Sequence, residues 1–360
     1  MRSSRIRIVV VINILVYSWF AISLIDAKPF TLYWNIPSFM CRKYAMPPIN
    51  VTEKYGIVQN EDDAFRGSAV SILYDPGKFP ALLENSSSRT LVQRNGGVPQ
   101  QGNLGEHLQV FRQHMNELIP DKNNNGLAII DFESWRPVYR QNFGTLQPYR
   151  NLSEDIERKR HPFAPERRIE AEATRNFEKA GRSFMESTIE MAHKMRPYAK
   201  WGYYGLPYCF NGRGATVEDC AKEVKEENDR TQWIYDSSDV IYPSVYMSED
   251  ILPNDRVKMV RGRVKESIRL ARRSHNIPKP KVIAYLRYVY TDSRNFLTEK
   301  DFYGAVNTVK SIGGDGVILW GSSFDLNSKA KCNQFYNYLE NVIGPIAQSF
   351  QPRYVVQPLL

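Results

Sequence analysis

Short runs of apolar residues recur along this chain, and most of them are followed by a segment with helical periodicity. The clearest run, Gly126-Leu-Ala-Ile-Ile-Asp131, is continuously apolar rather than alternating. This pattern is typical of a parallel strand that is buried on both faces. Alternation of such strands with helices over roughly 300 residues predicts an α/β barrel rather than an open doubly wound sheet. No GxGxxG sequence follows the first run, which also disfavours a dinucleotide-binding sheet.

Seven of these apolar runs are the predicted strands. They span residues 30–34, 69–74, 127–132, 200–204, 240–245, 281–285 and 316–320. Apolar residues recur at helical spacing over 169–195 and 256–273, with charged residues on the opposite side, which predicts two amphipathic helices. No linker rich in Pro, Gly or Ser divides the chain, so we predict a single domain.

The amino terminus has the composition of a secretory signal. The basic start MRSSRIR leads into an apolar stretch over residues 8–25, and cleavage is expected after Ala27. An uncleaved membrane anchor is the alternative, although Asn13, Ser18 and Ser23 interrupt the stretch. Removing residues 1–27 takes away three Arg and one Asp, which leaves 45 basic and 38 acidic residues and a net charge of +7. We therefore expect a secreted, extracellular protein with no membrane segment after cleavage.

Cysteine and sequon counts agree with export. The four cysteines allow two disulfides in any of three connectivities, and the three N-x-S/T sequons are candidate glycosylation sites. The cysteines are Cys41, Cys209, Cys220 and Cys332, and the sequons begin at Asn50, Asn85 and Asn151. The five histidines are scattered without metal-ligand spacing and no CxxC occurs, so we predict neither a metal site nor a cofactor.

An acid pair lies at the end of the third predicted strand, within Ile129-Ile-Asp-Phe-Glu-Ser-Trp-Arg-Pro137. Alternate strand residues point the same way, so Asp131 and Glu133 are expected to face one side. In a barrel the carboxyl ends of the strands form the active face. Each carboxylate disfavours ionisation of the other, so one keeps its proton at mildly acidic pH and can serve as a general acid. A lone D-x-E is otherwise most often a solvated acidic loop.

Aromatic residues follow three other predicted strands. Tyr204, Tyr246 and Trp320 each stand at or just after the end of a run. Taken singly, each is more often a packing residue of the core or rim. Convergence of all three beside a carboxyl pair describes a carbohydrate cleft, where aromatic faces stack on sugar rings.

The ordered set of motifs resembles the hyaluronidase family, glycoside hydrolase family 56, and in particular its bee, wasp and ant venom members. The similarity extends from Tyr33 to Pro345. Its motifs are Tyr33-Trp-Asn-Ile-Pro-Ser-Phe-Met-Cys41, Tyr74-Asp-Pro-Gly77, Arg94-Asn-Gly-Gly-Val-Pro-Gln100, the stretch 131–137 and Gly262-Arg-Val-Lys-Glu266. The stretch Tyr285-Leu-Arg-Tyr288 departs from the aromatic-rich sequence of venom members, which leaves the affinity of the subsites open.

This resemblance implies a distorted (β/α)7 TIM-like barrel over residues 28–350, followed by a tail over 351–360. It implies disulfides Cys41–Cys332 and Cys209–Cys220, and endo-hydrolysis of hyaluronan at the β-1,4 bonds that follow N-acetylglucosamine. The implied mechanism retains the anomeric configuration and uses the acetamide of the substrate as the nucleophile.

The resemblance also implies residue roles. Glu133 protonates the leaving oxygen and later deprotonates water, while Asp131 holds the acetamide nitrogen and offsets the charge that develops on the ring. Tyr204 and Tyr246 bond to the acetamide region, and Trp320 forms the floor of its pocket. The remaining groove positions implied by the resemblance are Tyr74, Asp75, Arg136, Arg263, Ser322 and Ser323.

Charge is compatible with this substrate, because hyaluronan carries a carboxylate on every disaccharide and a basic groove attracts it. Nucleic acid is a poor partner for an exported, glycosylated chain. The alternatives are a chondroitin-preferring hydrolase of the same family and a non-catalytic glycosaminoglycan-binding venom protein. A chitin-like substrate is disfavoured, because Ala128 and Ile129 stand where chitinases carry further acids.

Overall fold

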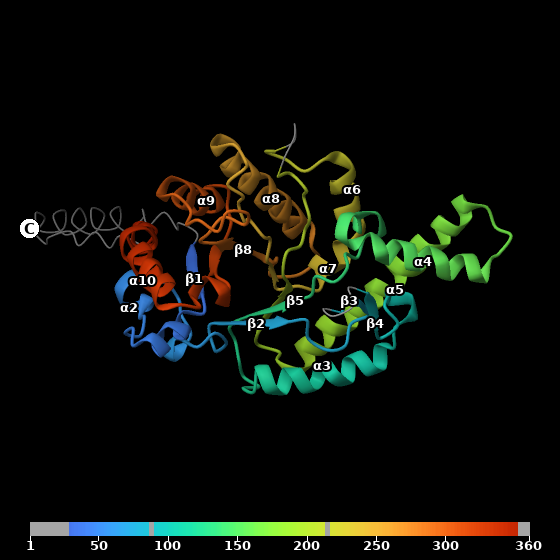
Figure 1. Ribbon diagram of the computed structural model, residues 1–360, viewed down its shortest axis with the longest axis horizontal. Helices are drawn as coiled ribbons and strands as arrows, with labels where there is room; N and C mark the ends of the chain where they lie inside the picture. Colours follow the sequence, from blue (N-terminus) through green and yellow to red (C-terminus); the bar gives the residue numbers. More distant parts are fainter. Residues whose placement is uncertain (1–28, 86–89, 213–216, 352–360) are drawn as a thin grey trace, which may run out of the picture.

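Parallel strands form a barrel at the centre of the protein (Figure 1). The computed structural model describes residues 29–85, 90–212 and 217–351. Within these residues, seven parallel strands form two ladders with the orders β1-β9-β8-β7 and β2-β5-β6. The strands are β1 Thr31–Asn35, β2 Val70–Tyr74, β5 Leu127–Asp131, β6 Lys200–Tyr203, β7 Val240–Ile241, β8 Lys281–Arg287 and β9 Gly316–Trp320. The predicted α/β barrel is confirmed.

The barrel is distorted where its two ladders meet. On one side an isolated bridge between Tyr204 and Tyr242 links β6 to β7. On the other side the segment around Val58 stands between the ladders. The N–H of Trp34 donates to Val58 O over 2.8 Å, and the N–H of Val58 donates to Leu32 O over 2.9 Å. A short non-strand segment therefore satisfies the backbone of β1 on the side that faces β2.

Helices pack around the strands, and one helical pair projects from the body (Figure 1). The projecting pair consists of α4 and α5, which contact each other, and α5 also contacts α3 and β6. The α-helices of the described residues are α2 Val51–Tyr55, α3 Leu104–Leu118, α4 Gln147–Arg160, α5 Glu166–Met195, α6 Lys222–Arg230, α7 Gln232–Asp236, α8 Pro253–Arg273, α9 Glu299–Ser311, α10 Lys329–Tyr338 and α11 Gly344–Ser349. The two predicted helices correspond to α5 and α8.

A short hairpin and several short helical segments stand apart from this alternation. The hairpin of β3 Ala81–Glu84 and β4 Leu91–Arg94 is antiparallel. Short helical segments fill several connections: η1 Ser38–Tyr44, η2 Glu61–Asp63, η3 Pro99–Gln101, η4 Tyr139–Gln141, η5 Gly144–Leu146, η6 Ser323–Leu326 and the π-helical η7 Leu339–Ile343. The hairpin was not expected from the sequence.

The predicted strand over 240–245 is shorter in the structure. Regular pairing of β7 ends at Ile241, and only isolated bridges continue it, at Tyr242 and Ser244. Pro243 lies between these two bridges and has no backbone N–H to give to a ladder. The chain therefore follows the direction of the strand without completing its hydrogen bonds.

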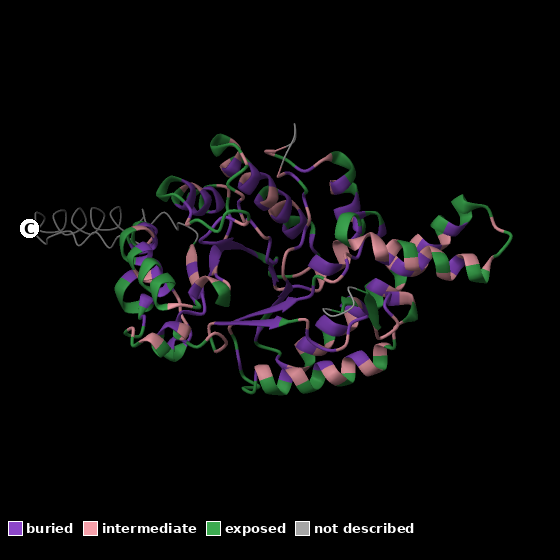
Figure 2. Cartoon of the chain, in the orientation of Figure 1, coloured by how far each residue is buried: buried purple, intermediate pink, exposed green. Residues whose placement is uncertain are grey.

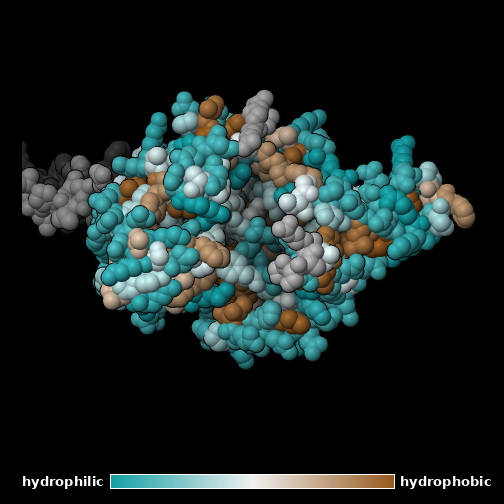
Figure 3. All heavy atoms as spheres, viewed as in Figure 1, coloured by the Kyte–Doolittle hydropathy of each residue, from teal (hydrophilic) through white to brown (hydrophobic). Residues whose placement is uncertain are grey.

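Apolar side chains fill the barrel interior and separate its two ends. The buried residues of this cluster alternate along their strands: Val70, Ile72, Leu127, Ile129, Val240, Tyr242, Ile283, Tyr285 and Ile318. The second and larger core lies between the strands and the surrounding helices, so the helices carry buried inner faces (Figure 2). Hydrophilic residues dominate the outer face of Figure 3, with hydrophobic residues in separate groups.

Both disulfides that the resemblance implies are present. Cys41 in η1 is bonded to Cys332 in α10 across 291 residues of sequence. Cys209 is bonded to Cys220 across 11 residues. The long link joins the first and last parts of the chain that forms the barrel, and cross-linking of distant residues stabilises a fold mainly by restricting its unfolded chain.

Two expectations about the termini concern residues beyond those described. The expected signal peptide, 1–27, lies outside them, as does the tail after Gln351. Gln351 itself donates its side-chain N–H to Gly56 O over 2.9 Å. Of the helices in the described ranges, none is long and apolar enough to span a membrane.

Close strand approach at Gly202 gives a test of this fold. A Cβ at Gly202 would lie 2.0 Å from Val240 O and 3.0 Å from the ring of Tyr242. We expect Gly202→Ala to lower the free energy of unfolding by about 2–3 kcal/mol, because a packed core resists added volume. The matched control is Gly105→Ala in α3, where the nearest atom is Asn103 Oδ1 at 3.4 Å. That change is expected to be neutral or mildly stabilising. Urea denaturation of both variants, with disulfides intact, tests the difference, and equal stabilities would contradict it.

Candidate active site

The acid pair stands at the centre of the strand ends, where two neighbouring strands hold it. Asp131 is the last residue of β5 and pairs in register with Tyr74 of β2. Backbone hydrogen bonds continue past the strands, from Asp75 N to Asp131 O over 2.7 Å and from Tyr204 N to Ile130 O over 3.0 Å. The ladder β2-β5-β6 therefore brings four of the predicted site residues to one edge.

Alternation along the chain places the two acids together. Asp131 and Glu133 share a side-chain hydrogen bond, as expected for alternate residues. Phe132 points the other way and stacks on Phe79 with ring centroids 4.0 Å apart. The buried ring fixes the chain between the acids, so both carboxyls are directed toward the barrel mouth.

The two carboxyls differ in exposure. Asp131 is only 9% exposed, whereas Glu133 is open to the groove. Burial raises the pKa of Asp131, and the adjacent Glu133 charge raises it further. Burial also raises the pKa of Glu133, while the hydrogen bond from Asp131 and the charge of Arg136 oppose that rise. The pair therefore retains a shared proton at a pH above the normal pKa range of carboxylic acids.

The predicted aromatic residues converge beside the acids. The ring centroids of Tyr204 and Tyr246 are 6.2 Å apart, and Tyr246 stacks on Trp320 at 5.7 Å. Trp320 Nε1 donates to the hydroxyl of Tyr74 over 2.8 Å. These four residues come from the ends of β6, β7, β9 and β2, so one wall of the mouth is aromatic. The convergence expected from the sequence is confirmed.

Asp75 belongs to the site because its charge acts on Asp131. Two arginines, to which no role was assigned from the sequence, contact Asp75 and its neighbour Tyr74. Asp75 has a left-handed backbone, with φ of 41°, and its charge contributes to the raised pKa of Asp131. Arg94 binds the Asp75 carboxylate with both terminal nitrogens. Arg66 lies over the ring of Tyr74, 5.8 Å from its centroid.

Arg136 lies in an aromatic cage next to Glu133. Its guanidinium is 4.7 Å from the ring centroid of Tyr208, 5.0 Å from that of Phe210 and 5.1 Å from that of Phe143. Arg136 Nη1 donates to Gln141 O over 2.5 Å. Arg136 and Glu133 line a cavity of about 250 Å³. The sequence predicted Arg136 but none of the three rings, of which Tyr208 and Phe210 share one loop and Phe143 comes from another.

Arg263 reaches the same cavity from α8. Its side chain donates to Ser244 O over 2.9 Å and to Asn211 Oδ1 over 3.1 Å. Both acceptors are uncharged, and burial lowers the pKa of the Arg263 guanidinium. The cation is thus placed beside Glu133 with neutral partners.

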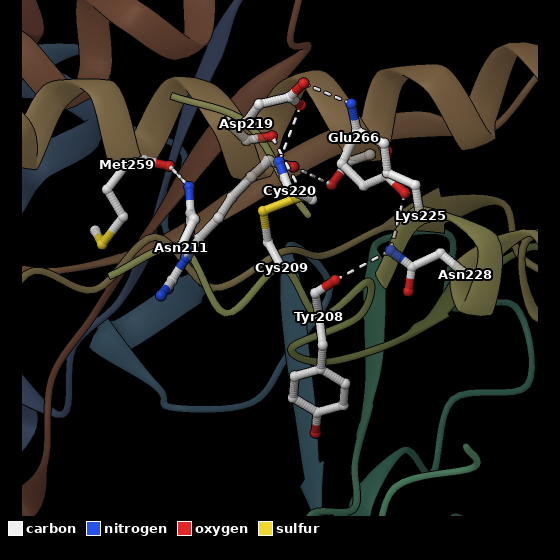
Figure 4. The surroundings of a disulfide bond; sticks show 12 residues. Tyr208, Cys209, Asn211, Asp219, Cys220, Lys225, Asn228, Met259 and Glu266 are labelled. Atoms are coloured by element: carbon white, nitrogen blue, oxygen red, sulfur yellow. Dashed lines mark hydrogen bonds and ion pairs between the residues drawn. A yellow bond between two sulfur atoms is a disulfide. The ribbon is translucent and has the colours of Figure 1, made fainter. Parts of the chain in front are cut away.

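The short disulfide supports this part of the wall. Figure 4 shows Cys209–Cys220 beside α8, with the ring of Tyr208 pointing away from the disulfide. Asn228 joins the segments by donating to Tyr208 O over 3.0 Å and to Glu266 Oε1 over 2.8 Å. The loop that carries the cage residues Tyr208 and Phe210 is therefore fixed covalently and by hydrogen bonds.

Ser322 and Ser323 lie beyond Trp320, at the start of η6. Ser322 is its N-cap, and its hydroxyl accepts from Phe324 N over 3.3 Å. Ser323 is exposed. Asp325 accepts a hydrogen bond from Ser322 N. Both of its carboxylate oxygens also accept from Arg287 Nη2, at 2.8 and 2.9 Å. Arg287 also lies 5.4 Å from the Trp320 ring centroid, a role that the sequence did not indicate.

A larger cavity, of about 970 Å³, lies at the opposite end of the barrel. Its walls include Leu127, Lys200, Val240 and Lys281, which are at the amino ends of their strands. Every candidate residue described above lies at the carboxyl ends, where barrel active sites are found. Across the described parts of the chain, no three His, Cys, Asp or Glu side chains are grouped to hold a metal ion.

The three sequon asparagines lie at the surface. Asn50 is exposed, and its Oδ1 accepts from Glu53 N at the start of α2 over 3.1 Å. Asn151 is exposed on α4. Asn85 is exposed at the last described residue before the segment 86–89. Exposure makes each of them accessible, and their glycosylation stays a prediction.

Fold and site together define a TIM-like barrel glycosidase, with an acid pair and an aromatic wall at the carboxyl ends of its strands. The hyaluronidase family profile matches residues 20–351, so the chain belongs to the hyaluronidase family. It is 49% identical over 320 residues to the hyaluronidase of Apis mellifera, covering 88% of this chain and 83% of that protein. It is 46% identical over 319 residues to hyaluronidase Tab y 2.0101 of Tabanus yao, covering 89% and 91%.

A solved structure agrees with these relatives. The fold is similar to the crystal structure of bee venom hyaluronidase in complex with a hyaluronic acid tetramer, with a TM-score of 0.86 and 48% sequence identity. The match covers 89% of this chain and 99% of the bee chain. The resemblance drawn from the motifs is thereby confirmed.

The raised pKa of Asp131 predicts a pH-dependent stability. Unfolded Asp131 ionises near pH 4, whereas the folded residue keeps its proton to about pH 8. This group therefore contributes stability that is fully present below pH 4 and is lost as the pH rises toward 8. We expect Asp131→Asn to raise the melting temperature at pH 7 by several degrees and to change it little at pH 4. Calorimetry at both pH values tests this, with exposed Asp62→Asn as the control. An equal gain at both pH values would contradict it.

Proposed function

We propose that this protein is a secreted endo-β-N-acetylhexosaminidase that hydrolyses hyaluronan with retention of configuration. The observation that carries the proposal is the exposed Glu133 carboxyl, hydrogen-bonded to the buried Asp131 beneath an aromatic wall. Family membership and the hyaluronic acid tetramer bound by the bee venom relative support this substrate.

In the proposed mechanism Glu133 donates a proton to the oxygen of the leaving sugar. The acetamide oxygen of the substrate attacks the anomeric carbon as the glycosidic bond breaks. Glu133 then takes a proton from water, which adds to the anomeric carbon and opens the cyclic intermediate. The net reaction consumes one water and restores the acid.

Asp131 prepares this step by exchanging its proton. A carboxylate accepts a hydrogen bond from an acetamide N–H more strongly than a neutral carboxyl does, so a bound substrate favours the ionised Asp131 and moves the shared proton to Glu133. The Asp131 charge then offsets the positive charge on the ring and acetamide. Tyr204 and Tyr246 bind the acetamide region, and Trp320 stacks below it.

The geometry favours the substrate over a protein carboxylate as the nucleophile. Retaining enzymes with a carboxylate nucleophile separate their two acids by roughly 5–5.5 Å. Asp131 and Glu133 are instead within hydrogen-bonding distance. The other nearby acid, Asp75, is bound by Arg94 on both oxygens. No free carboxylate thus lies opposite Glu133 among the described groove residues.

Groove composition matches a polyanionic sugar chain. Arg136 and Arg263 lie next to Glu133 and are available to glucuronate carboxylates. Tyr74, Asp75, Ser322 and Ser323 extend the groove on either side. Chondroitin carries the same carboxylate and an equivalent acetamide, so it is the second candidate substrate.

Export belongs to the same proposal. Two disulfides are typical of proteins made in an oxidising compartment, and the surface sequons fit passage through the secretory route. We infer cleavage after Ala27, a catalytic barrel over 28–350, and an extracellular site of action.

Replacing Glu133 tests the proton donor. We expect Glu133→Gln to reduce the rate at which hyaluronan solutions lose viscosity between pH 4 and 7 by roughly 10²–10⁴-fold, because an amide transfers no proton. Viscometry of the secreted protein measures this, and Glu186→Gln, at a partly exposed position on α5, is the control. Activity of Glu133→Gln near that of the unmodified protein would overturn the assignment. Cleavage of chondroitin but not hyaluronan by the unmodified protein would establish the second substrate.

Arg136 is expected to set the upper pH limit of activity. Its charge lowers the pKa of Glu133, so Arg136→Gln removes a stabiliser of the carboxylate and raises that pKa. The alkaline limb of the kcat/KM profile should therefore move to higher pH, along with a higher KM. Arg182→Gln on α5, which pairs with Glu186 at the surface, is the matched control. A limb that stays in place or moves to lower pH would refute this coupling.

A further inference from the structure

A third cavity, of about 830 Å³, adjoins the groove beyond Trp320. It shares Ser322 and Arg287 with the end of the aromatic wall and extends along α10 and η7. Its volume is in the range of small-ligand sites, roughly 300–1,000 Å³. None of the acetamide-binding residues proposed above lines it.

The cavity carries an excess of positive charge. Arg287, Arg294 and Lys331 line it, and Asp325 is the one acid among its described lining residues. Asp325 is already bound by Arg287. Lys331 Nζ donates to Phe324 O and Asn327 Oδ1, both uncharged. Arg294 is exposed and pairs with no described carboxylate. Two cations therefore lack an acidic partner.

Polar and aromatic groups complete the walls. Gln334 and Asn337 contribute side-chain amides, and the ring of Phe324 is 74% exposed. Two deeply buried lining groups have no hydrogen-bond partner in the structure, the Tyr288 hydroxyl and Arg287 Nε. Tyr288 is 1% exposed and Arg287 is 6% exposed. Unpaired buried polar groups are costly unless a ligand or water satisfies them.

We propose that this cavity is an outer subsite that binds a negatively charged sugar unit of the polysaccharide through Arg294 and Lys331. The inference rests on the proposed function, because it extends the same groove. Cations bind carboxylate and sulfate groups by charge-assisted hydrogen bonds, amides bind sugar hydroxyls, and an exposed ring offers a face for stacking. The bound anion is a uronate carboxylate or a sulfate ester.

Binding is measured in the full secreted chain carrying Glu133→Gln, so that oligosaccharides stay intact during calorimetry. Adding Arg294→Gln or Lys331→Gln should weaken binding of a hyaluronan octasaccharide by roughly tenfold. Neither should change binding of a carboxyl-reduced octasaccharide, in which neutral glucose replaces glucuronate. Arg167→Gln, at an exposed arginine in the first turn of α5, controls for the loss of one surface charge.

Unsulfated chondroitin and chondroitin sulfate octasaccharides separate the two sources of the anion. Equal losses for both assign the carboxylate, and a larger loss for the sulfated chain assigns the sulfate. Unchanged hyaluronan binding in both variants, or an equal loss for the neutral chain or the Arg167→Gln control, would overturn the subsite. Failure of the unmodified protein to cleave hyaluronan that it binds would instead overturn the proposed function alone.

Discussion

The hydrogen-bond ladder on either side of β5 sets the position of everything at the active face. Tyr74 is level with Asp131 across the β2–β5 pairing, and Tyr204 follows the last paired residue of β6. A one-residue slip in a strand turns every side chain to the opposite face. Correct register therefore decides whether Asp131 meets its neighbours in the mouth or is lost in the core between strands and helices.

The same register places Asp131 where its ionisation is unfavourable. Asp131 is held above a packed apolar barrel interior, where ionisation is unfavourable, and Glu133 is close enough to oppose it. This environment lowers the stability of the fold, but it also keeps a proton on the acid pair next to the sugar. Replacing the buried acid would stabilise the fold and remove this proton, a trade between stability and activity that is common at active sites.

Sequence patterns predicted the parts of the structure that are encoded locally. Buried parallel strands are continuously apolar, so all seven were located, and the period of two placed Asp131 and Glu133 together. Contacts between distant side chains have no such signature. Arg94 reaches Asp75 from the unexpected β3–β4 hairpin, the rings around Arg136 come from two different loops, and Val58 fills the gap beside β1. Pairing of the cysteines came from family resemblance, since spacing alone left three connectivities open.

The net positive charge is compatible with a polyanionic substrate. How strongly each cation attracts that substrate depends on the partner that the cation already has in the protein. Arg94 and Arg269 are bound to carboxylates, so little of their charge is available to a ligand. Arg136 is held by rings and a carbonyl, and Arg263 by a carbonyl and an amide. Neutral partners fix a guanidinium in place without cancelling its charge. Arg136 and Arg263 therefore keep a positive charge that is available to an anionic chain in the groove.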